Sequence, residues 1–177
     1  MMPPTLFVVS GMQWAGKTTA SGLLARRFER GAHVSGDALQ HMIVSGSQWP
    51  EQREMSEEAR RQLRLRHACT LGTSFLAAGF TAVLDDIVIG LRVDDLLEDL
   101  KAQPFIFVML TPELDAVKRR ELGRGTRLWE AWAWMDDEIR DRTRRIGLWI
   151  DSSELTPDET VDEILRRCWT EGLVQPR

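Results

Sequence analysis

The chain lacks several features that would place it in a specialised class of protein. Its 177 residues include no tyrosine, two cysteines and three histidines. Cys69 and Cys168 lie far apart and without the spacing of metal ligands. They predict two buried or partly buried thiols in a reducing compartment, and not a disulfide framework. His33, His41 and His67 likewise show no ligand spacing, so no role is assigned to them.

Long apolar runs and an excess of basic charge are also missing. No segment approaches the roughly 20 apolar residues that a membrane-spanning helix needs. The first residues lack the basic region and apolar stretch of a secretory signal, so we expect a cytoplasmic protein with no membrane partner. The net charge of −4 argues against a protein that coats nucleic acid, since such domains carry a basic excess. It does not exclude a polynucleotide that binds at a local basic patch.

What is present is the composition of a globular domain, with 43% hydrophobic and 28% charged residues. Short apolar runs alternate with helical patterns. Strands are predicted at 5–10, 32–35, 81–84, 104–110 and 148–150, and helices at 18–30, 37–44, 54–78, 92–101, 112–122, 129–145 and 157–169. A capping box with a proline, Thr156 to Glu159, opens the last helix. The alternation predicts one domain over 1–177, a three-layer α/β fold whose parallel sheet is covered by helices on both faces.

One motif carries most of the chemistry. The segment from Gly11 to Thr18, GMQWAGKT, fits G-x-x-x-x-G-K-S/T and lies between the first strand and the first helix, which is the context this motif requires. Backbone N–H groups and the helix dipole would face the phosphates, while Lys17 reaches the β- and γ-phosphates and Thr18 ligates Mg²⁺. ATP and Mg²⁺ are therefore the expected cofactors. The residues expected around the nucleotide are Gly11, Met12, Gln13, Trp14, Ala15, Gly16, Lys17, Thr18, Thr19 and Arg120.

Three carboxylates follow strands whose carboxyl ends would face the ligand crevice of a parallel sheet. Asp37 comes after the second strand. It could orient an acceptor hydroxyl and take its proton, or it could be the N-cap of the next helix. Asp85 and Asp86 end the third strand and are candidates to hold a metal-bound water or a substrate hydroxyl; alternatively, one of them caps the next loop. Alternation would send one of the pair away from the crevice, which makes Asp86 the weaker candidate.

A glycine-containing break at 123–127 separates two helical patterns and is flanked by arginines. Arg120, Arg124 and Arg127 could form a lid, at about 120–130, that closes over the triphosphate and stabilises the transferring phosphoryl group. The alternative is a solvated helix face.

Three of the seven tryptophans lie directly after this break. Trp129 and Trp132 would share one helix face, whereas Trp134 would point elsewhere. Such residues are ordinarily packed in a core. An aromatic wall against a substrate ring is the alternative.

These motifs, in this order, resemble the P-loop small-molecule kinases, which include chloramphenicol phosphotransferase, gluconate kinase and shikimate kinase. The likeness covers nearly the whole chain and is closest to chloramphenicol phosphotransferase. It is carried by Gly36-Asp37 before a short helix, by Asp85-Asp86-Ile87, and by RELGRGTR at 120–127. It implies the P-loop fold of the nucleoside-monophosphate-kinase type with strand order 2-3-1-4-5. It also implies a base at Asp37, γ-phosphate contacts from Arg124 and Arg127, and an adenine loop at 150–153.

The chain also departs from these families. The residues after Asp86 do not look like the substrate segment of gluconate kinases, and the basic residue and glycines of shikimate kinases are not found. Region 45–66, where such kinases bind their acceptor, matches no pattern of the family. The resemblance therefore supports the reaction and leaves the acceptor open.

Three functions are compatible with these observations. The first is an ATP-dependent phosphotransferase that acts on a hydroxyl of a small molecule, an antibiotic or similar natural product among the candidates. The second is a polynucleotide 5′-hydroxyl kinase, which would need a basic channel; the candidates for it are Arg60, Arg61, Arg64 and Arg66. The third is a regulatory module that binds ATP and turns it over poorly. Asp37 together with lid arginines favours transfer, because a switch needs neither a base nor a lid.

Overall fold

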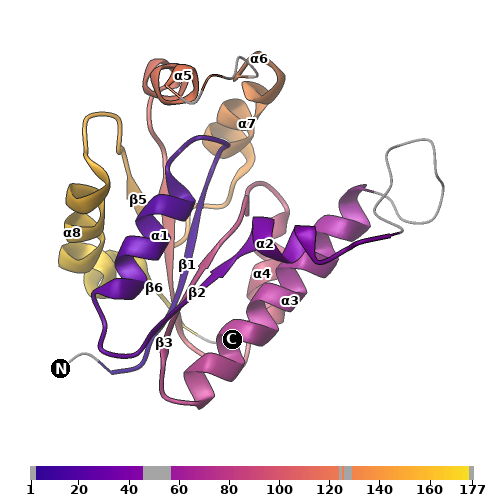
Figure 1. Ribbon diagram of the computed structural model, residues 1–177, viewed down its shortest axis with the longest axis vertical. Helices are drawn as coiled ribbons and strands as arrows, with labels where there is room; N and C mark the ends of the chain where they lie inside the picture. Colours follow the sequence, from indigo (N-terminus) through magenta and orange to yellow (C-terminus); the bar gives the residue numbers. More distant parts are fainter. Residues whose placement is uncertain (1–2, 46–56, 124, 126–128, 176–177) are drawn as a thin grey trace.

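A parallel sheet forms the centre of the computed structural model, which describes residues 3–45, 57–123, 125 and 129–175 (Figure 1). Its strand order, β2-β3-β1-β4-β5, confirms the predicted order. The strands are β1 (Leu6–Gly11), β2 (Gly31–Ser35), β3 (Thr81–Asp85), β4 (Phe105–Leu110) and β5 (Leu148–Ile150). All residues of β1, β3 and β4 are buried, as their near-continuous apolar sequences predict for strands covered on both faces.

A sixth strand, β6 (Leu173–Val174), was not predicted. It pairs antiparallel with the start of β4, where Phe105 faces Val174. β5 is only three residues long and pairs with the other end of β4, at 108–110. A two-residue strand is too short to show a periodicity in the sequence, which is why it was not predicted. It pairs with the part of β4 that β5 does not reach.

Helices cover both faces of the sheet, which confirms the three-layer architecture. Helices α1 and α8 lie on one side, and α2, α3 and α4 lie on the other (Figure 1). Their bounds are α1 (Lys17–Arg26), α2 (Gly36–His41), α3 (Glu57–Ala77), α4 (Arg92–Asp99) and α8 (Pro157–Arg167). The predicted capping box is present at α8, where the Thr156 hydroxyl accepts from the Glu159 N–H and the Glu159 carboxylate accepts from the Thr156 N–H. None of the described helices is both long and apolar enough to cross a membrane.

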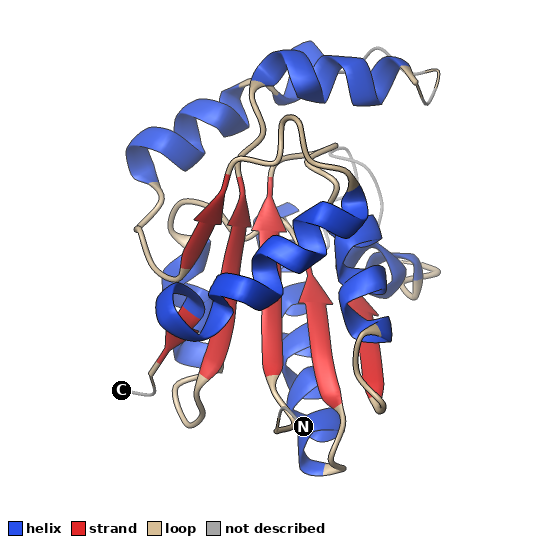
Figure 2. Cartoon of the chain, turned by 90° about the vertical axis from the view of Figure 1, so that its left-hand side faces the viewer, coloured by secondary structure: helices blue, strands red, loops and turns tan. Residues whose placement is uncertain are grey.

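A group of short helices lies above the carboxyl ends of the strands (Figure 2). They are α5 (Leu114–Leu122), α6 (Trp129–Trp132), α7 (Trp134–Asp137) and the π-helical turn η1 (Glu138–Arg142). A second π-helical turn, η2 (Cys168–Gly172), follows α8.

The prediction of a single helix at 129–145 is therefore wrong. The segment breaks into α6, α7 and η1, and its last helical turn ends at Arg142, with Thr143 as the C-cap. The Thr143 hydroxyl donates to the Glu138 carbonyl at 2.9 Å and accepts from the Gly90 N–H at 2.7 Å. This hydroxyl satisfies a helix-end carbonyl and ties the segment to the loop before α4.

Candidate active site

The loop between β1 and α1 is curled by unusual backbone conformations. Gly16 has a φ of 95°, and Trp14, the one described non-glycine residue with positive φ, has a φ of 59°. Gly11 is required for a different reason: a Cβ there would lie 2.6 Å from the Leu110 carbonyl oxygen. The curl leads into α1, whose first turn directs its backbone N–H groups toward the loop. This is the geometry of a phosphate-binding loop.

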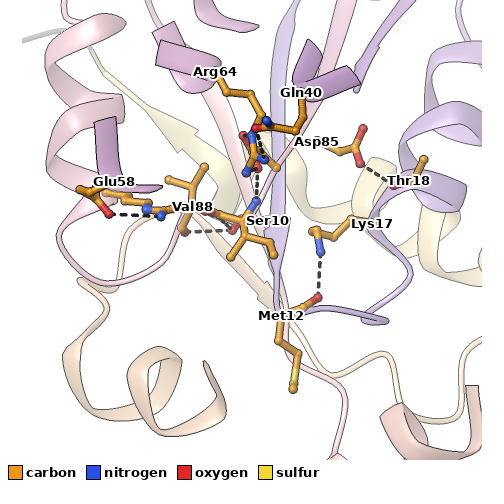
Figure 3. A network of polar contacts seen from close by, with 12 residues as sticks. Ser10, Met12, Lys17, Thr18, Gln40, Glu58, Arg64, Asp85 and Val88 are labelled. Atoms are coloured by element: carbon orange, nitrogen blue, oxygen red, sulfur yellow. Dashed lines mark hydrogen bonds and ion pairs between the residues drawn. The ribbon is translucent and has the colours of Figure 1, made fainter. Parts of the chain in front are cut away.

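Lys17 is the buried cation of this loop. Its side chain is almost enclosed, and Nζ donates to the Met12 carbonyl at 2.8 Å (Figure 3). Burial lowers the pKa of Lys17 to about 8, and the carboxylates of Asp85 and Asp86 oppose that shift. A buried ammonium is stabilised by an anion placed beside it, so the site favours a negatively charged ligand here.

Asp85 connects the loop to the neighbouring strands. Its Oδ2 accepts from the Thr18 hydroxyl at 2.6 Å (Figure 3). Its Oδ1 lies 2.6 Å from Nε2 of His33 on β2. The carboxylate is buried, at 4% exposure. His33 had no role predicted from the sequence, which carries no signal for this contact. The contact depends on the register of β2 beside β3, which pairs Ser35 with Asp85 and leaves His33 two residues away on the same face.

The Thr18–Asp85 pair has the chemistry of a Mg²⁺ site. Mg²⁺ prefers hard oxygen ligands and is commonly bound through one or two protein side chains together with substrate phosphates. Within the described part of the chain, no group of three or more His, Cys, Asp or Glu side chains is arranged so that it could hold a metal ion by itself. The hydroxyl and carboxylate oxygens at this position therefore fit an ion that takes its other ligands from phosphate and water.

Asp86 points into the same pocket as Asp85. The expected alternation does not separate the two side chains, because β3 ends at Asp85. Asp86 is held by Arg64 of α3, whose Nε and Nη2 reach the two carboxylate oxygens at 2.8 and 2.5 Å. The Ile87 N–H adds a third bond at 2.7 Å. Gly36 allows this placement, since a Cβ there would lie 2.7 Å from the Asp86 Cγ.

Asp37 occupies the junction between two cavities. It is the second residue of α2, whose N-cap is Ser35, so the N-cap alternative for Asp37 is wrong. The exposed carboxylate lines the phosphate pocket together with Lys17 and Thr18. It also lines a cavity of about 710 Å³, which we call the large cavity, bounded by α2, α3, the loop 87–92 and the segment 132–138. Gln13 and Ile87 line both spaces as well.

A third cavity, of about 390 Å³, opens on the other side of the phosphate loop. Arg120 lines this cavity and bonds to two segments of the chain. Its Nη1 donates to the Ala15 carbonyl at 3.1 Å, and its Nη2 donates to the Ser152 carbonyl at 2.5 Å. The Ser152 hydroxyl is 1% exposed and has no hydrogen-bond partner among the described residues. Trp14 and Thr19 line this cavity too. Its position places the expected adenine loop and Arg120 next to the phosphate loop.

The tryptophan cluster is divided between two environments. Trp132 and Trp134 line the large cavity, while Trp129 lies under the Lys118 ammonium, 4.3 Å from its ring centroid. None of α6 is buried. The expectation that Trp134 points away from Trp132 is wrong, because the segment breaks into α6 and α7 and both side chains line the same cavity.

Two groups of arginines give different outcomes. Arg124 and Arg127, expected to contact the γ-phosphate, lie outside the described residues. Of the four arginines proposed for a polynucleotide channel, Arg60, Arg61 and Arg64 line the large cavity. Arg66 is instead exposed and lies 3.9 Å from Asp99. The four therefore do not form one basic track, and the polynucleotide alternative is not favoured.

Comparison with solved structures identifies proteins of the same fold. A gluconokinase from Sinorhizobium meliloti 1021 is 21% identical with a TM-score of 0.65, and the match covers 94% of this chain and 92% of the other. An APS kinase from Mycobacterium tuberculosis, in complex with AMPPNP and APS, is 18% identical with a TM-score of 0.68, covering 94% and 98%. The tunicamycin resistance protein of Deinococcus radiodurans is 15% identical with a TM-score of 0.70, covering 97% and 99%. No family model matches the sequence, and no curated protein matches it significantly. At these identities the likeness shows a shared fold, that of P-loop small-molecule kinases.

Proposed function

We propose that the protein is an ATP-dependent kinase that transfers the γ-phosphoryl group to a hydroxyl of a small molecule bound in the large cavity. The observation that carries this proposal is the position of Asp37, which lines both the phosphate pocket and the large cavity. A carboxylate at such a junction can contact an acceptor hydroxyl and the transferring group at once. A module that only binds ATP has no need of that arrangement.

The residues around the phosphates are suited to positioning and charge stabilisation, which supply most of the catalysis in phosphoryl transfer. Lys17 and the backbone N–H groups of the loop would hold the β- and γ-phosphates. Mg²⁺, when bound with ATP, neutralises charge on the phosphate oxygens, and Thr18 with Asp85 would hold it. We assign Arg124 and Arg127 the γ-phosphate contacts, on the resemblance of segment 120–127 alone.

Asp37 would act as the general base. Its carboxylate would accept a hydrogen bond from the acceptor hydroxyl, which directs a lone pair of the hydroxyl oxygen at the γ-phosphorus. The carboxylate would then take the hydroxyl proton as the new O–P bond forms. The β–γ bridging bond breaks, and the electron pair leaves with ADP. Arg120 and the loop 150–153 would contact the base of the nucleotide in the 390 Å³ cavity. Hydroxylated antibiotics are a reasonable first class of acceptor, in keeping with the chloramphenicol phosphotransferase resemblance and with the resistance protein among the structural neighbours.

The test is Asp37→Asn, measured after a screen with labelled ATP against hydroxylated antibiotics, sugar acids and 5′-hydroxyl oligonucleotides. The substitution keeps size and removes the charge. Transfer should fall by about 10²- to 10⁴-fold, the usual scale for a lost general base. Thermal stability should stay within roughly 0.5 kcal/mol, an ordinary surface effect, and ATP affinity should be retained.

Asp115→Asn is a matched control. Asp115 is also an exposed aspartate in the first turn of a helix, and it lines neither cavity. It should transfer phosphate at the wild-type rate. A destabilised but fully active Asp37→Asn protein would show that Asp37 is structural. The base would then have to be sought at Asp85 or Asp86.

A further inference from the structure

Two hydrogen bonds meet on the carboxylate of Asp85 from opposite sides. The Thr18 hydroxyl donates to Oδ2 at 2.6 Å (Figure 3). On the other side, Nε2 of the His33 ring lies 2.6 Å from Oδ1. An ionised carboxylate has only acceptor atoms, so the ring nitrogen is the donor of this second bond. Each oxygen of Asp85 therefore has a side-chain donor of its own.

The bond from His33 fixes the orientation of this carboxylate. The terminal torsion of an aspartate is broad and has no sharply preferred rotamer. The Thr18 hydroxyl alone would hold one oxygen and leave the carboxylate free to turn about that contact. With a donor at each oxygen, the plane of the group is set. The direction in which Oδ2 faces the phosphate pocket therefore depends on the donor at Oδ1.

The nearby cations of the described residues do not supply that donor. Lys17 lines the same pocket as Asp85, but its Nζ donates to the Met12 carbonyl at 2.8 Å. Arg64 directs Nε and Nη2 at the two oxygens of Asp86 instead. The orientation of Asp85 is therefore left to the ring on β2.

His33 is held behind the site and does not face the ligand. Its side chain is 25% exposed, whereas that of Asp85 is 4% exposed. The Nδ1 side of the ring faces α1, where a Cβ at Gly22 would lie 3.7 Å from Nδ1. In the described part of the chain, His33 lines neither the phosphate pocket nor the large cavity. Any effect of His33 on the nucleotide must therefore pass through Asp85.

Metal ligands are oriented by hydrogen bonds from the residues behind them, and loss of such a partner typically costs about 10- to 100-fold in metal affinity. The Thr18 hydroxyl hydrogen is directed at Asp85, which leaves the lone pairs of the hydroxyl oxygen for a cation. We propose that His33 is a positioning residue of the Mg²⁺ site. By holding Oδ1 of Asp85, it keeps Oδ2 and the Thr18 oxygen oriented toward the ion that accompanies ATP. This inference rests on the proposed function and adds a residue to its metal site.

The experiment measures how strongly Mn²⁺, used in place of Mg²⁺, raises the affinity of the full chain for AMPPNP. Calorimetry gives the affinity with Mn²⁺ and with EDTA, and the ratio of the two is the contribution of the metal. His33→Phe keeps a ring and removes the donor. In this variant the ratio should fall by about tenfold or more. The affinity in EDTA should remain that of the wild type, because His33 does not line the phosphate pocket.

A conservative variant and a control accompany this measurement. His33→Gln places an amide N–H₂ donor at the same number of bonds from the backbone as Nε2, so it should retain most of the wild-type ratio. His67→Phe makes the same change at an exposed histidine of α3 that lines neither space, and it should behave as the wild type does. Thermal unfolding checks that each variant is folded.

Two further readouts separate positioning from a structural role. If His33 acts through the Asp85 carboxylate, then His33→Phe should change the ratio little once Asp85→Asn is present, as a double-mutant cycle would show. A ring that merely packs β2 against α1 would have the same effect in both backgrounds. Nitrogen NMR of the metal-free protein should also show a proton on Nε2 of His33. A ring protonated on Nδ1 alone cannot donate to Asp85.

Three outcomes would overturn the inference. They are an unchanged ratio in His33→Phe, an equal loss of affinity with Mn²⁺ and with EDTA, and a ring protonated on Nδ1 alone. The wild type is measured first, which separates this inference from the function on which it rests. Absence of AMPPNP binding would refute the kinase proposal. AMPPNP binding that gains equally from Mn²⁺ in the wild type and in His33→Phe would refute only the role of His33.

Discussion

Replacing Arg64 with methionine removes the charge that faces Asp86 and keeps a side chain of similar length. The side chains of Arg64 and Asp86 are 12% and 8% exposed. In the variant, the Asp86 carboxylate keeps the Ile87 N–H at 2.7 Å and loses both guanidinium bonds. Breaking a buried ion pair from one side costs about 3–5 kcal/mol, because it leaves an uncompensated charge.

Some solvent reaches this pair, so we expect a destabilisation somewhat below that range, about 2–4 kcal/mol. For a chain of this size, each kcal/mol lowers Tm by about 2–4 °C, which gives a fall of roughly 5–15 °C. Calorimetry on Arg64→Met, Asp86→Asn and the double variant measures the coupling between the two side chains. The double variant should be more stable than Arg64→Met, because the stranded charge is gone.

Arg66→Met is the control for Arg64→Met. It changes the same residue type two positions along α3, but Arg66 is exposed and its partner Asp99 is 3.9 Å away. An exposed pair of this kind contributes about 0–1 kcal/mol. If the two methionine variants melt at the same temperature, the pair between Arg64 and Asp86 does not hold this side of the site together and our reasoning is refuted.

Three further predictions concern stability, reactivity and catalysis. Gly22→Ala should raise the free energy of unfolding by roughly 0.5–1 kcal/mol, because a Cβ inside α1 meets one atom at an ordinary 3.7 Å. Gly36→Ala should lower the free energy of unfolding by roughly 1–3 kcal/mol, because its Cβ would overlap the Asp86 carboxylate. Equal shifts of the urea midpoint in the Gly22→Ala and Gly36→Ala variants would contradict these expectations. Burial raises the pKa of Cys69 to about 12, so iodoacetamide at pH 8 should label it only after unfolding, and rapid labelling of the native protein by mass spectrometry would be the contrary result. Lys17→Ala should abolish phosphate transfer while circular dichroism shows an intact fold; transfer at the wild-type rate would rule out the phosphate-loop assignment.

The amino-acid sequence by itself determined the local elements of this protein. Continuous apolar runs are sufficient to predict β1 and β4, since strands buried on both faces have no polar alternation. The capping box at Thr156 and Glu159 and the phosphate-loop motif are equally local, because each depends on residues within one or two turns. The motif also brings Lys17 and Thr18 into the lining of one pocket.

The prediction for Asp37 needed one more step. The carboxyl ends of parallel strands share an edge, so a residue just after the second strand had to lie near the loop after the first. What this rule could not supply is the large cavity on the other side of Asp37. That cavity is formed by the packing of α3 and the segment 132–138 in the folded chain.

The tertiary structure alone decided the partners of the site residues. His33 and Asp85 are 52 residues apart, and Arg64 and Asp86 are 22 apart. Helical and strand periodicities describe which face of an element is buried, and they carry no information about which polar side chain it meets there. The end of the helical segment after η1 belongs to the same class, since the Thr143 hydroxyl there bonds to Gly90, 53 residues away. Contacts of this length form only when the chain is packed, which is why they could be seen in the structure and not in the sequence.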